Sequence, residues 1–336
     1  MSQFSDNDVI LSVIEFDHNE QASGNRFNIA FGIDKNFLFG CGVSVASILI
    51  SNPTVSFEFH VFTDTFSEED HRRFSELAAQ YRTCIKIYLI DCAKLKSLPS
   101  TKNWTYATYF RFVIADYFFH KVDKLLYLDA DIACKGSIQE LVDYRFAEHE
   151  IAAVVAERGL DWWTNRANVL TTPQLVSGYF NAGFLLININ EWNQNDISAK
   201  AIDMLRVPEW VEKITHLDQD VLNVLLAGKV NFIDGKFNTR FSINYELKDD
   251  VINPVNDETV FIHYVGPTKP WHEWATYPVS QSFLEAKARS PWRNVDLLKP
   301  GNSNQYRYSA KHNYKQKRYL QGLLNYINYY RLKITH

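Results

Sequence analysis

The stretch LLYLDADIACKGS, residues 125–137, is an apolar run that is interrupted by two carboxylates, Asp129 and Asp131. The run predicts a buried strand, where a charged group is costly. Because side chains two residues apart on an extended backbone point to the same side, both carboxylates face one place at the end of this strand. Either a positively charged group lies there, or the pair belongs to a solvated turn that begins a loop.

Strands and helices alternate on the N-terminal side of this stretch. We expect strands at residues 27–33, 57–64, 84–91 and 124–131, and helices at residues 37–50, 67–81 and 105–118. Such alternation is typical of an α/β fold with a mostly parallel sheet flanked by helices. Residues 1–25 are polar, and we expect them to form an irregular N-terminal segment.

The pattern becomes less regular after residue 136. We expect further strands at residues 150–157, 183–189, 230–234 and 259–266, and helices at residues 191–206 and 219–228. Four aspartates stand at or just beyond the C-terminal ends of the first four predicted strands: Asp34, Asp64, Asp91 and Asp129. Ligands of open α/β sheets bind beyond such strand ends. The sequence contains neither GxGxxG after the first strand nor GxxxxGK[ST], so those two phosphate-binding loops are excluded.

The composition excludes some classes of protein. The chain of 336 residues carries a net charge of −4, which argues against a general nucleic-acid binder. Its four cysteines show no CxxC spacing, and we expect buried free thiols in a reducing compartment. The first twenty residues are rich in acidic side chains, unlike a secretory signal, and no apolar run approaches the length of a membrane span. We therefore expect a cytoplasmic protein.

The C-terminal segment differs from the rest of the chain. Residues 297–336 contain eight basic and no acidic residues, whereas the remainder is acidic, and Pro300-Gly301 marks a hinge at its start. One interpretation of residues 306–333 is a helix that covers an apolar groove on the body. The other is an interfacial segment, with its aromatic residues at the level of lipid headgroups and its basic residues toward anionic lipid. We favour the interfacial segment.

Three later motifs contain residue types that suit a metal–diphosphate site, although each has a simpler explanation. His263 lies in an apolar strand, where a hydrogen-bonded core histidine is more common, and Lys269 lies in a Gly-Pro loop, where a solvated lysine is ordinary. The NAG motif at 181–183 suits a tight turn as well as a close approach by a ligand. Asp218 and Asp220 begin a helix, and either could be its N-cap.

Taken together, six motifs in order resemble glycosyltransferase family 8: AFGIDKN, YFRF, YLDADI, YFNAGFLLIN, DQDVLN and IHYVGPTKPWH. The resemblance implies a Rossmann-like catalytic domain of GT-A type over residues 26–295. The polar segment 1–25 would precede this domain, and a basic, aromatic helical tail, 296–336, would follow it. Within the family, the chain looks most like the bacterial hexosyltransferases that form α-1,3 linkages in the lipopolysaccharide core.

The resemblance also implies which residues form the site. Asp129, Asp131 and His263 would hold a divalent metal, either Mn²⁺ or Mg²⁺. The residues implied to bind the UDP-sugar are Ala30, Asp34, Asn36, Arg111, Asp129, Ala130, Asn181, Ala182, Gly183, Gly266 and Lys269. Those implied to act beside the reacting carbon or the leaving diphosphate are Asp218, Gln219 and Arg111. Glu157 and Phe37 are implied to contact the acceptor, although some relatives have Tyr in place of Phe37.

The implied reaction moves a hexose from a UDP-hexose to a sugar of the lipopolysaccharide outer core. Galactose is the preferred donor sugar, and glucose is the alternative. Retention of configuration would arise through a covalent intermediate on Asp218 or Gln219, or by front-face attack. The amide of Gln219 is a poor nucleophile, and we favour front-face attack. The other interpretations are a UDP-sugar hydrolase, a self-glycosylating protein and a non-catalytic saccharide-binding protein. A lipid-linked acceptor would place the basic tail on the inner face of the cytoplasmic membrane.

Overall fold

The computed structural model describes residues 9–100 and 105–334, which form two compact units. The sheet unit comprises the described residues of 9–38, 52–130 and 137–237. The C-terminal unit comprises residues 39–51, 131–136 and 238–334. The chain passes from the first unit to the second between Ala130 and Asp131, inside the motif that carries both carboxylates. The predicted boundaries at residues 25 and 295 remain predictions.

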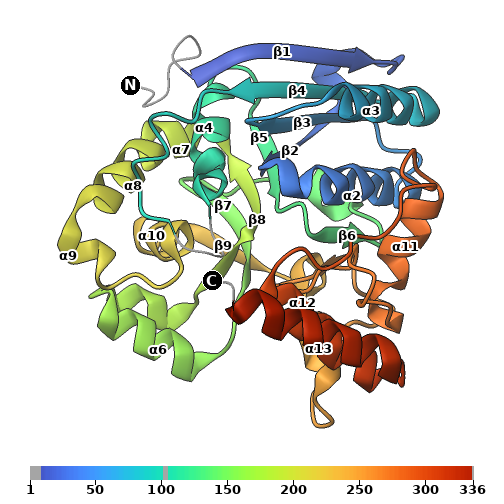
Figure 1. Ribbon diagram of the computed structural model, residues 1–336. Helices are drawn as coiled ribbons and strands as arrows, with labels where there is room; N and C mark the ends of the chain where they lie inside the picture. Colours follow the sequence, from blue (N-terminus) through green and yellow to red (C-terminus); the bar gives the residue numbers. More distant parts are fainter. Residues whose placement is uncertain (1–8, 101–104, 335–336) are drawn as a thin grey trace. The chain divides into compact units, whose positions relative to one another are not determined.

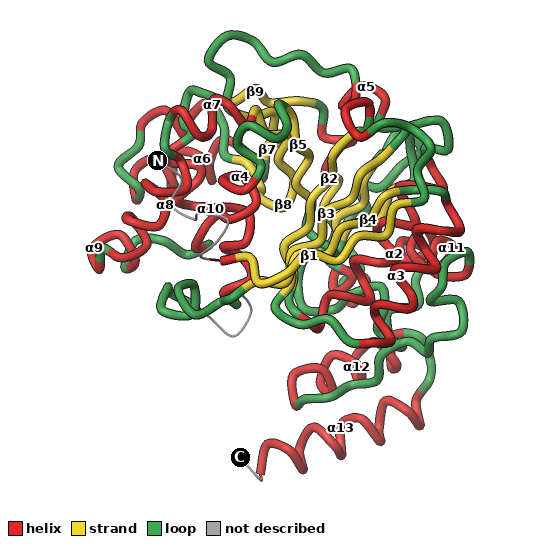
Figure 2. The backbone as a smooth tube through the Cα atoms, turned by 90° about the horizontal axis from the view of Figure 1, so that it is seen from above, coloured by secondary structure: helices red, strands yellow, loops and turns green. Residues whose placement is uncertain are grey.

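An eight-stranded sheet forms the centre of the sheet unit (Figures 1 and 2). Its strands in spatial order are β1 (Ile10–Asp17), β4 (Cys84–Ile90), β3 (Phe57–Thr63), β2 (Phe27–Ile33), β5 (Lys124–Leu128), β8 (Phe180–Asn188), β7 (Ala152–Ala156) and β9 (Val230–Ile233). The run from β4 to β5 is parallel, as is the pair β7 and β9. Pairs β1–β4, β5–β8 and β7–β8 are antiparallel. The α/β prediction is confirmed, with more antiparallel pairing than expected.

The order of the strands places a topological switch point at β2 and β5. The chain runs from β2 to β3 on one side of β2, and later places β5 on its other side. A ligand site is expected at the carboxyl ends of such a pair. Asp34, Asp64, Asp91 and Asp129 each follow immediately after the last residue of β2, β3, β4 and β5. The prediction that these aspartates stand at strand ends is therefore confirmed.

Helices cover the sheet through apolar side chains. The helices of this unit are α3 (Glu68–Tyr81), α4 (Phe110–Tyr117), α5 (Gln139–Val142), α6 (Leu160–Val169), α7 (Ile189–Gln194), α8 (Ile197–Arg206), α9 (Pro208–Val211) and α10 (Leu217–Leu225). A buried apolar cluster joins α4, α7, α8 and α10 to strand residues such as Tyr88 and Leu125. Ser67 caps α3 as predicted, in a capping box with Asp70. The predicted helix 191–206 is divided, because Asp196 adopts a left-handed conformation with φ of 52°.

The prediction that residues 1–25 are irregular is wrong for residues 10–17, which form the edge strand β1. Most of its side chains are exposed, but its sequence ILSVIEFD is rich in the apolar and β-branched residues typical of a strand, a signal that the prediction overlooked. The strand forms by antiparallel pairing with β4, where Phe16 is buried and Glu15 forms an ion pair with Lys86 at 3.5 Å. Local β propensity and pairing with β4 therefore agree for this strand.

The C-terminal unit contains a three-stranded sheet, β10 (Thr239–Arg240), β11 (Phe261–His263) and β6 (Ile132–Cys134). Its helices are α2 (Leu38–Ser51), α11 (Gln281–Ala288), α12 (Ser303–Lys315) and α13 (Tyr319–Ile334). The first residue of α2, Leu38, belongs to the sheet unit. The predicted strand 124–131 ends at Leu128, and the chain resumes as β6 in this second sheet. All four cysteines are free and buried, as predicted: Cys41, Cys84, Cys92 and Cys134.

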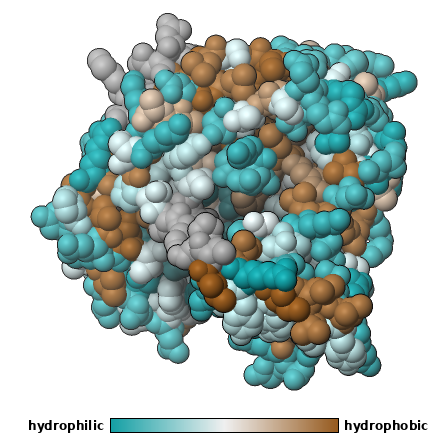
Figure 3. Space-filling view, viewed as in Figure 1, coloured by the Kyte–Doolittle hydropathy of each residue, from teal (hydrophilic) through white to brown (hydrophobic). Residues whose placement is uncertain are grey.

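The tail forms a pair of helices that lie side by side, α12 and α13 (Figure 1). Asn325 Nδ2 donates to Ser309 Oγ at 2.8 Å, and Gly322 packs closely against Tyr314. Helix α12 is docked within its unit, with Ala310 and His312 buried. Helix α13 instead exposes a series of large side chains: Tyr319, Leu320, Leu323, Leu324, Ile327, Tyr330 and Ile334. Brown, hydrophobic surface lies in the region of this helix in Figure 3. Among the described residues, no helix has the length and apolar character needed to cross a membrane.

Gly42 in α2 gives a test of the packing of the C-terminal unit. A Cβ atom at this position would lie 2.1 Å from Trp292 Cη2, a fully buried side chain. Alanine is the better helix former, yet we expect Gly42→Ala to lower the free energy of unfolding by about 1–3 kcal/mol, because overpacking outweighs propensity. Urea unfolding followed by circular dichroism measures the change.

Gly301→Ala is the matched control, because its Cβ would meet its nearest neighbour, Gln305, at an ordinary 3.5 Å. Equal stability of the Gly42→Ala protein and the wild type would contradict the packing described for α2.

Candidate active site

Asp129 is positioned by the strand that precedes it. Its backbone N–H donates to Gly183 O at 2.8 Å, which continues the pairing of β5 with β8. Tyr127, two residues earlier, points to the same side, and its hydroxyl donates to Asp129 Oδ1 at 3.1 Å. The carboxylate is therefore fixed at the strand end, where the sequence placed it.

Arg111 on α4 joins Asp129 to Asp218. Its Nη2 lies 3.3 Å from Asp129 Oδ1, and its Nε lies 3.1 Å from Asp218 Oδ2. Nη1 donates to the carbonyl oxygen of Ala182, and the guanidinium lies over the ring of Tyr127 with 4.6 Å to the centroid. Burial alone would lower the pKa of the Arg111 guanidinium. The nearby Asp218, followed by Tyr127 and Asp129, outweighs this effect, so the pKa of Arg111 is raised. Arg111 is thus a permanent, buried cation.

Asp218 is buried near the start of α10. Thr108 Oγ1 donates to its Oδ1 at 2.6 Å, and Arg111 occupies the other oxygen. Burial raises the pKa of Asp218, and Arg111 opposes this effect. Neither Asp218 nor Asp220 is the N-cap, which is His216 without a side-chain cap, so the simpler explanation of both residues is wrong. Asp220 instead forms a buried ion pair with Arg166 at 2.8 Å.

Gln219 connects two segments through its amide group. Its Oε1 accepts from Asn181 Nδ2 at 2.9 Å and from the backbone N–H of Ala182 at 3.1 Å. Its Nε2 donates to Glu157 Oε2 at 3.1 Å and to the Tyr179 hydroxyl at 3.2 Å. The structure therefore brings together Gln219, the NAG motif and Glu157. The NAG motif lies inside β8, so its interpretation as a tight turn is wrong.

The end of β2 holds the residues that were implied to contact uridine and ribose. Asp34 Oδ1 accepts from Asn36 N at 2.9 Å, and Asp34 Oδ2 accepts from Thr105 Oγ1 at 3.2 Å. Ala30 is fully buried within β2, whereas Asn36 is exposed and Phe37 is partly exposed. Asp34 therefore shapes the turn after β2, with Asn36 at its surface.

The C-terminal unit contains a second polar cluster, formed by Asp131, His263 and Lys269. Asp131 Oδ2 lies 2.5 Å from Lys269 Nζ, and Asp131 Oδ1 lies 3.1 Å from His263 Nε2. Asp131 and His263 are buried. Although burial alone would raise the pKa of the carboxyl group, Lys269 and His263 hold the pKa of Asp131 well below its usual value. Asp131 is therefore ionised.

This cluster fits a divalent cation. His263 Nδ1 lies 2.9 Å from Asn238 Oδ1, and this contact orients the ring so that Nε2 lies 3.1 Å from Asp131 Oδ1. Asp131 Oδ1 is buried and receives no hydrogen bond. A buried carboxylate oxygen and an imidazole nitrogen 3.1 Å apart are ligand types that one divalent cation accepts. The set of carboxylate and imidazole ligands is thus compatible with a divalent metal.

Lys269 is held by a loop with special backbone requirements. Gly266 has φ of +89°, a conformation that other residues rarely adopt, and a Cβ there would approach Ser242 Oγ to 2.9 Å. Lys269 Nζ also donates to Tyr264 O at 2.8 Å. Thr268 Oγ1 donates to Asn244 Oδ1 at 2.6 Å, and His312 Nε2 of α12 lies 2.9 Å from the same oxygen. Helix α12 is thereby linked to the lysine loop.

Sequence reasoning missed several residues of this site. Tyr127 and Thr108 bind the two carboxylates, Tyr179 supports Gln219, and Asn238 sets the orientation of His263. Only Tyr127 had a usable signal, because it precedes Asp129 by two residues on the same strand. The other three come from distant segments that only the fold brings near.

Known proteins resemble this chain over nearly its whole length. Glycosyl transferase family 8 matches residues 28–275, and the C-terminal domain of that family matches residues 277–333. The lipopolysaccharide 1,3-galactosyltransferase of Salmonella typhimurium is 62% identical over 99% of this chain and 98% of that protein. The lipopolysaccharide glucosyltransferase WaaO of Escherichia coli is 56% identical over the same shares.

A solved structure shares the fold. The galactosyltransferase LgtC, crystallised with donor and acceptor sugar analogues, superposes with a TM-score of 0.66 at 24% identity. The match covers 80% of this chain and 99% of LgtC. The expected GT-A-type fold is thus confirmed.

Asp131→Asn tests the cation site without a large change of shape. We expect Mn²⁺ to raise the melting temperature of the wild type and to leave that of Asp131→Asn unchanged, because the substitution removes the buried negative charge. Thermal unfolding with and without Mn²⁺ measures the difference.

The control is Asp296→Asn, which changes an exposed carboxylate of the same unit. Stabilisation of the Asp131→Asn protein by Mn²⁺ to the same extent as the wild type and the control would refute the assignment.

Proposed function

Because the chain belongs to glycosyl transferase family 8, we propose that it transfers a hexose from a UDP-sugar to the lipopolysaccharide core, with retention at the anomeric carbon. Glycosyltransferases of this family use UDP-sugar donors and usually a divalent metal. The observation that carries the proposal is the buried pair of Asp131 and His263, whose possible ligand atoms lie 3.1 Å apart, beside Lys269. A cation and an ammonium group together suit the diphosphate of such a donor.

The chemistry required is stabilisation of the leaving diphosphate. Negative charge grows on this group as the bond to the sugar breaks, and fixed positive groups are usually the largest catalytic contribution. A metal held by Asp129, Asp131 and His263 would supply a Lewis acid, and Lys269 would exchange its contact with Asp131 for one with phosphate. Gly266 allows the lysine loop to approach the donor closely.

We assign Arg111 a positioning role. All its nitrogen atoms already contact protein groups, namely Asp129, Asp218 and the carbonyl oxygens of Thr108 and Ala182. It therefore fixes the two carboxylates and adds positive potential. Ala130, beside Asp129, and residues Ala30, Asp34 and Asn36 remain proposed donor contacts.

The contacts of Asp218 and Gln219 favour front-face attack over a covalent intermediate. Both oxygens of Asp218 are engaged, by Thr108 and by Arg111, which makes it a weak nucleophile. The amide oxygen of Gln219 accepts two hydrogen bonds. We propose that Gln219, Asn181, Ala182 and Gly183 hold the donor sugar while the leaving phosphate accepts the proton of the attacking hydroxyl. Glu157, bound to Gln219, and Phe37 would contact the acceptor.

Galactose is the proposed donor sugar and an α-1,3 bond the proposed linkage. Identity to the galactosyltransferase of Salmonella typhimurium, 62%, exceeds identity to the glucosyltransferase WaaO, 56%. The two sugars differ only in the orientation of one hydroxyl, so a few hydrogen bonds decide the preference. Glucose is the second candidate for that reason.

We further propose that α13 associates with the inner face of the cytoplasmic membrane. Its exposed leucines lie on a helix that ends in the basic residues Arg331 and Lys333. An apolar helix surface with nearby basic residues suits an anionic lipid surface, to which each basic residue adds about 1 kcal/mol. A lipid-linked acceptor lies at the same surface.

The transfer reaction is tested with Mn²⁺ and lipopolysaccharide that lacks the outer core, and UDP-galactose and UDP-glucose are supplied in separate reactions. We expect a mass gain of one hexose from UDP-galactose and little or none from UDP-glucose. Mass spectrometry measures the product. Release of free sugar without acceptor gain would support a hydrolase instead, and gain from UDP-glucose alone would reverse the donor assignment.

The membrane proposal is tested with Leu323→Ser combined with Leu324→Ser, two exposed positions on α13. We expect weaker sedimentation with phosphatidylglycerol vesicles, because about 1–2 kcal/mol of apolar burial is lost for each leucine. Ile252→Ser is the control, since this side chain is 90% exposed but lies outside α13. Equal vesicle binding by all three proteins would exclude α13 as the contact.

A further inference from the structure

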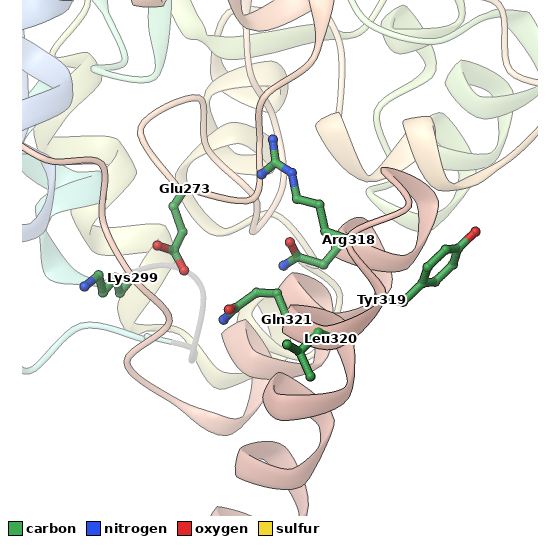
Figure 4. Close-up of a pocket in the computed structure, with 7 residues that line it drawn as sticks. Glu273, Lys299, Arg318, Tyr319, Leu320 and Gln321 are labelled. Atoms are coloured by element: carbon green, nitrogen blue, oxygen red, sulfur yellow. The ribbon is translucent and has the colours of Figure 1, made fainter.

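A pocket of about 750 Å³ lies entirely within the C-terminal unit, beside the turn between α12 and α13. Figure 4 shows its walls: Glu273 comes from the loop after Lys269, and Arg318 and Gln321 come from the turn and the start of α13. The lining residues are Glu273, Lys299, Asn313, Arg318, Tyr319, Leu320 and Gln321. A volume of this size is sufficient for a sugar-sized or larger ligand.

The charged groups of this pocket are not used by the protein itself. The Arg318 guanidinium and the Glu273 carboxylate line the same pocket, but neither side chain forms an ion pair or a hydrogen bond with any residue that the structure describes. Lys299, at the rim, likewise has no such partner among the described residues. Elsewhere on this helix pair a basic residue of the same kind does find a partner, since Lys315 pairs with Asp249.

The polar groups around Arg318 suit a sugar that carries a phosphate. A guanidinium binds phosphate through two parallel hydrogen bonds, and an ammonium group at the rim adds a second positive charge. A carboxylate and side-chain amides accept hydrogen bonds from sugar hydroxyls, which Glu273, Asn313 and Gln321 provide. A free inorganic anion would leave the carboxylate and the amides without a partner, whereas sugar hydroxyls supply one.

The pocket is joined to the lysine loop by short connections. Glu273 N donates to Leu298 O at 3.1 Å, and Leu298 N donates to Trp271 O at 2.8 Å. These bonds fix the segment around Lys299 to the segment that begins at Lys269. Glu273 follows Lys269 by four residues, so their Cα atoms are at most about 14 Å apart. A ligand here therefore lies within a few sugar lengths of the proposed diphosphate contact.

We propose that this pocket is a subsite for a phosphorylated sugar of the acceptor saccharide. This sugar binds in the pocket, while a different sugar of the same saccharide receives the hexose. The inference rests on the proposed transfer to a lipid-linked saccharide and names a part of that acceptor. A phosphate could also come from the headgroup of a membrane lipid. Glu273 and the amides favour the saccharide, because they match hydroxyl groups.

The test compares two lipid-free acceptors, the deacylated phosphorylated core oligosaccharide and the same oligosaccharide after removal of its phosphates. For Arg318→Gln we expect KM for the phosphorylated acceptor to rise about tenfold, since one charge-assisted contact is lost. The kcat, the KM for UDP-sugar and the KM for the dephosphorylated acceptor should stay unchanged. Lys311→Gln is the control, because it removes the same charge from an exposed position of α12 outside the pocket.

An equal rise of KM for both acceptors, or no rise for either, would overturn the proposal. Binding to phosphatidylglycerol vesicles is the second measurement, in which Arg318→Gln and Lys311→Gln should behave alike. A specific loss of vesicle binding by Arg318→Gln, with unchanged oligosaccharide kinetics, would assign the pocket to a lipid headgroup instead.

Calorimetry separates this inference from the proposed function. If the wild type binds the phosphorylated oligosaccharide and Arg318→Gln binds it about tenfold more weakly, the pocket assignment stands even if no hexose is transferred. If transfer occurs but Arg318→Gln binds the oligosaccharide as tightly as the wild type, the proposed function stands and the pocket assignment is wrong.

Discussion

The ionic contacts of Arg111 are the constraint on which the sheet unit depends. One buried guanidinium holds Asp129 at the end of β5 and Asp218 at the start of α10, segments that are far apart in the sequence. Without this cation, a buried carboxylate would be left uncompensated, at a cost of roughly 3–5 kcal/mol. The positive charge of Arg111 therefore both stabilises the fold and sets the electrostatic potential at the strand ends. A substitution that removes this charge would alter both properties. The ring of Tyr127 lies beneath the guanidinium, and both side chains are buried.

The C-terminal unit follows a different principle, because its polar groups form a connected network around one loop. Asn244 accepts hydrogen bonds from Thr268 and from His312, and Tyr277 lies 2.8 Å from the other nitrogen of His312. Burial lowers the pKa of His312 to about 4, so the imidazole is neutral and its single proton is committed to Asn244. Such a network has one arrangement in which every member is satisfied, and this specifies the position of the loop that carries Lys269.

The sequence predicted those features that depend on local order and failed where distant segments decide the structure. Alternation of strands and helices, with an aspartate at each strand end, follows from the periodicity of the chain, and Asp129 and Asp131 were found on that basis. The edge strand β1 was missed although its apolar, β-branched sequence favours a strand, because the residues on both sides of it are polar. Asp220 was considered as a cap, but its partner Arg166 lies more than fifty residues earlier, and no local rule connects them. The order of family motifs supplied the site residues that physical reasoning alone left ambiguous.

The four buried cysteines give the protein internal reporters of its own unfolding. Burial raises the pKa of Cys84 and of Cys92 to about 12, so both thiols remain protonated and unreactive toward alkylating reagents while the fold is intact. Those two belong to the sheet unit, and Cys41 and Cys134 belong to the C-terminal unit. The rate at which each thiol is labelled therefore records the opening of its own unit. A reagent in solution distinguishes a molecule that opens as a whole from one whose two units open separately.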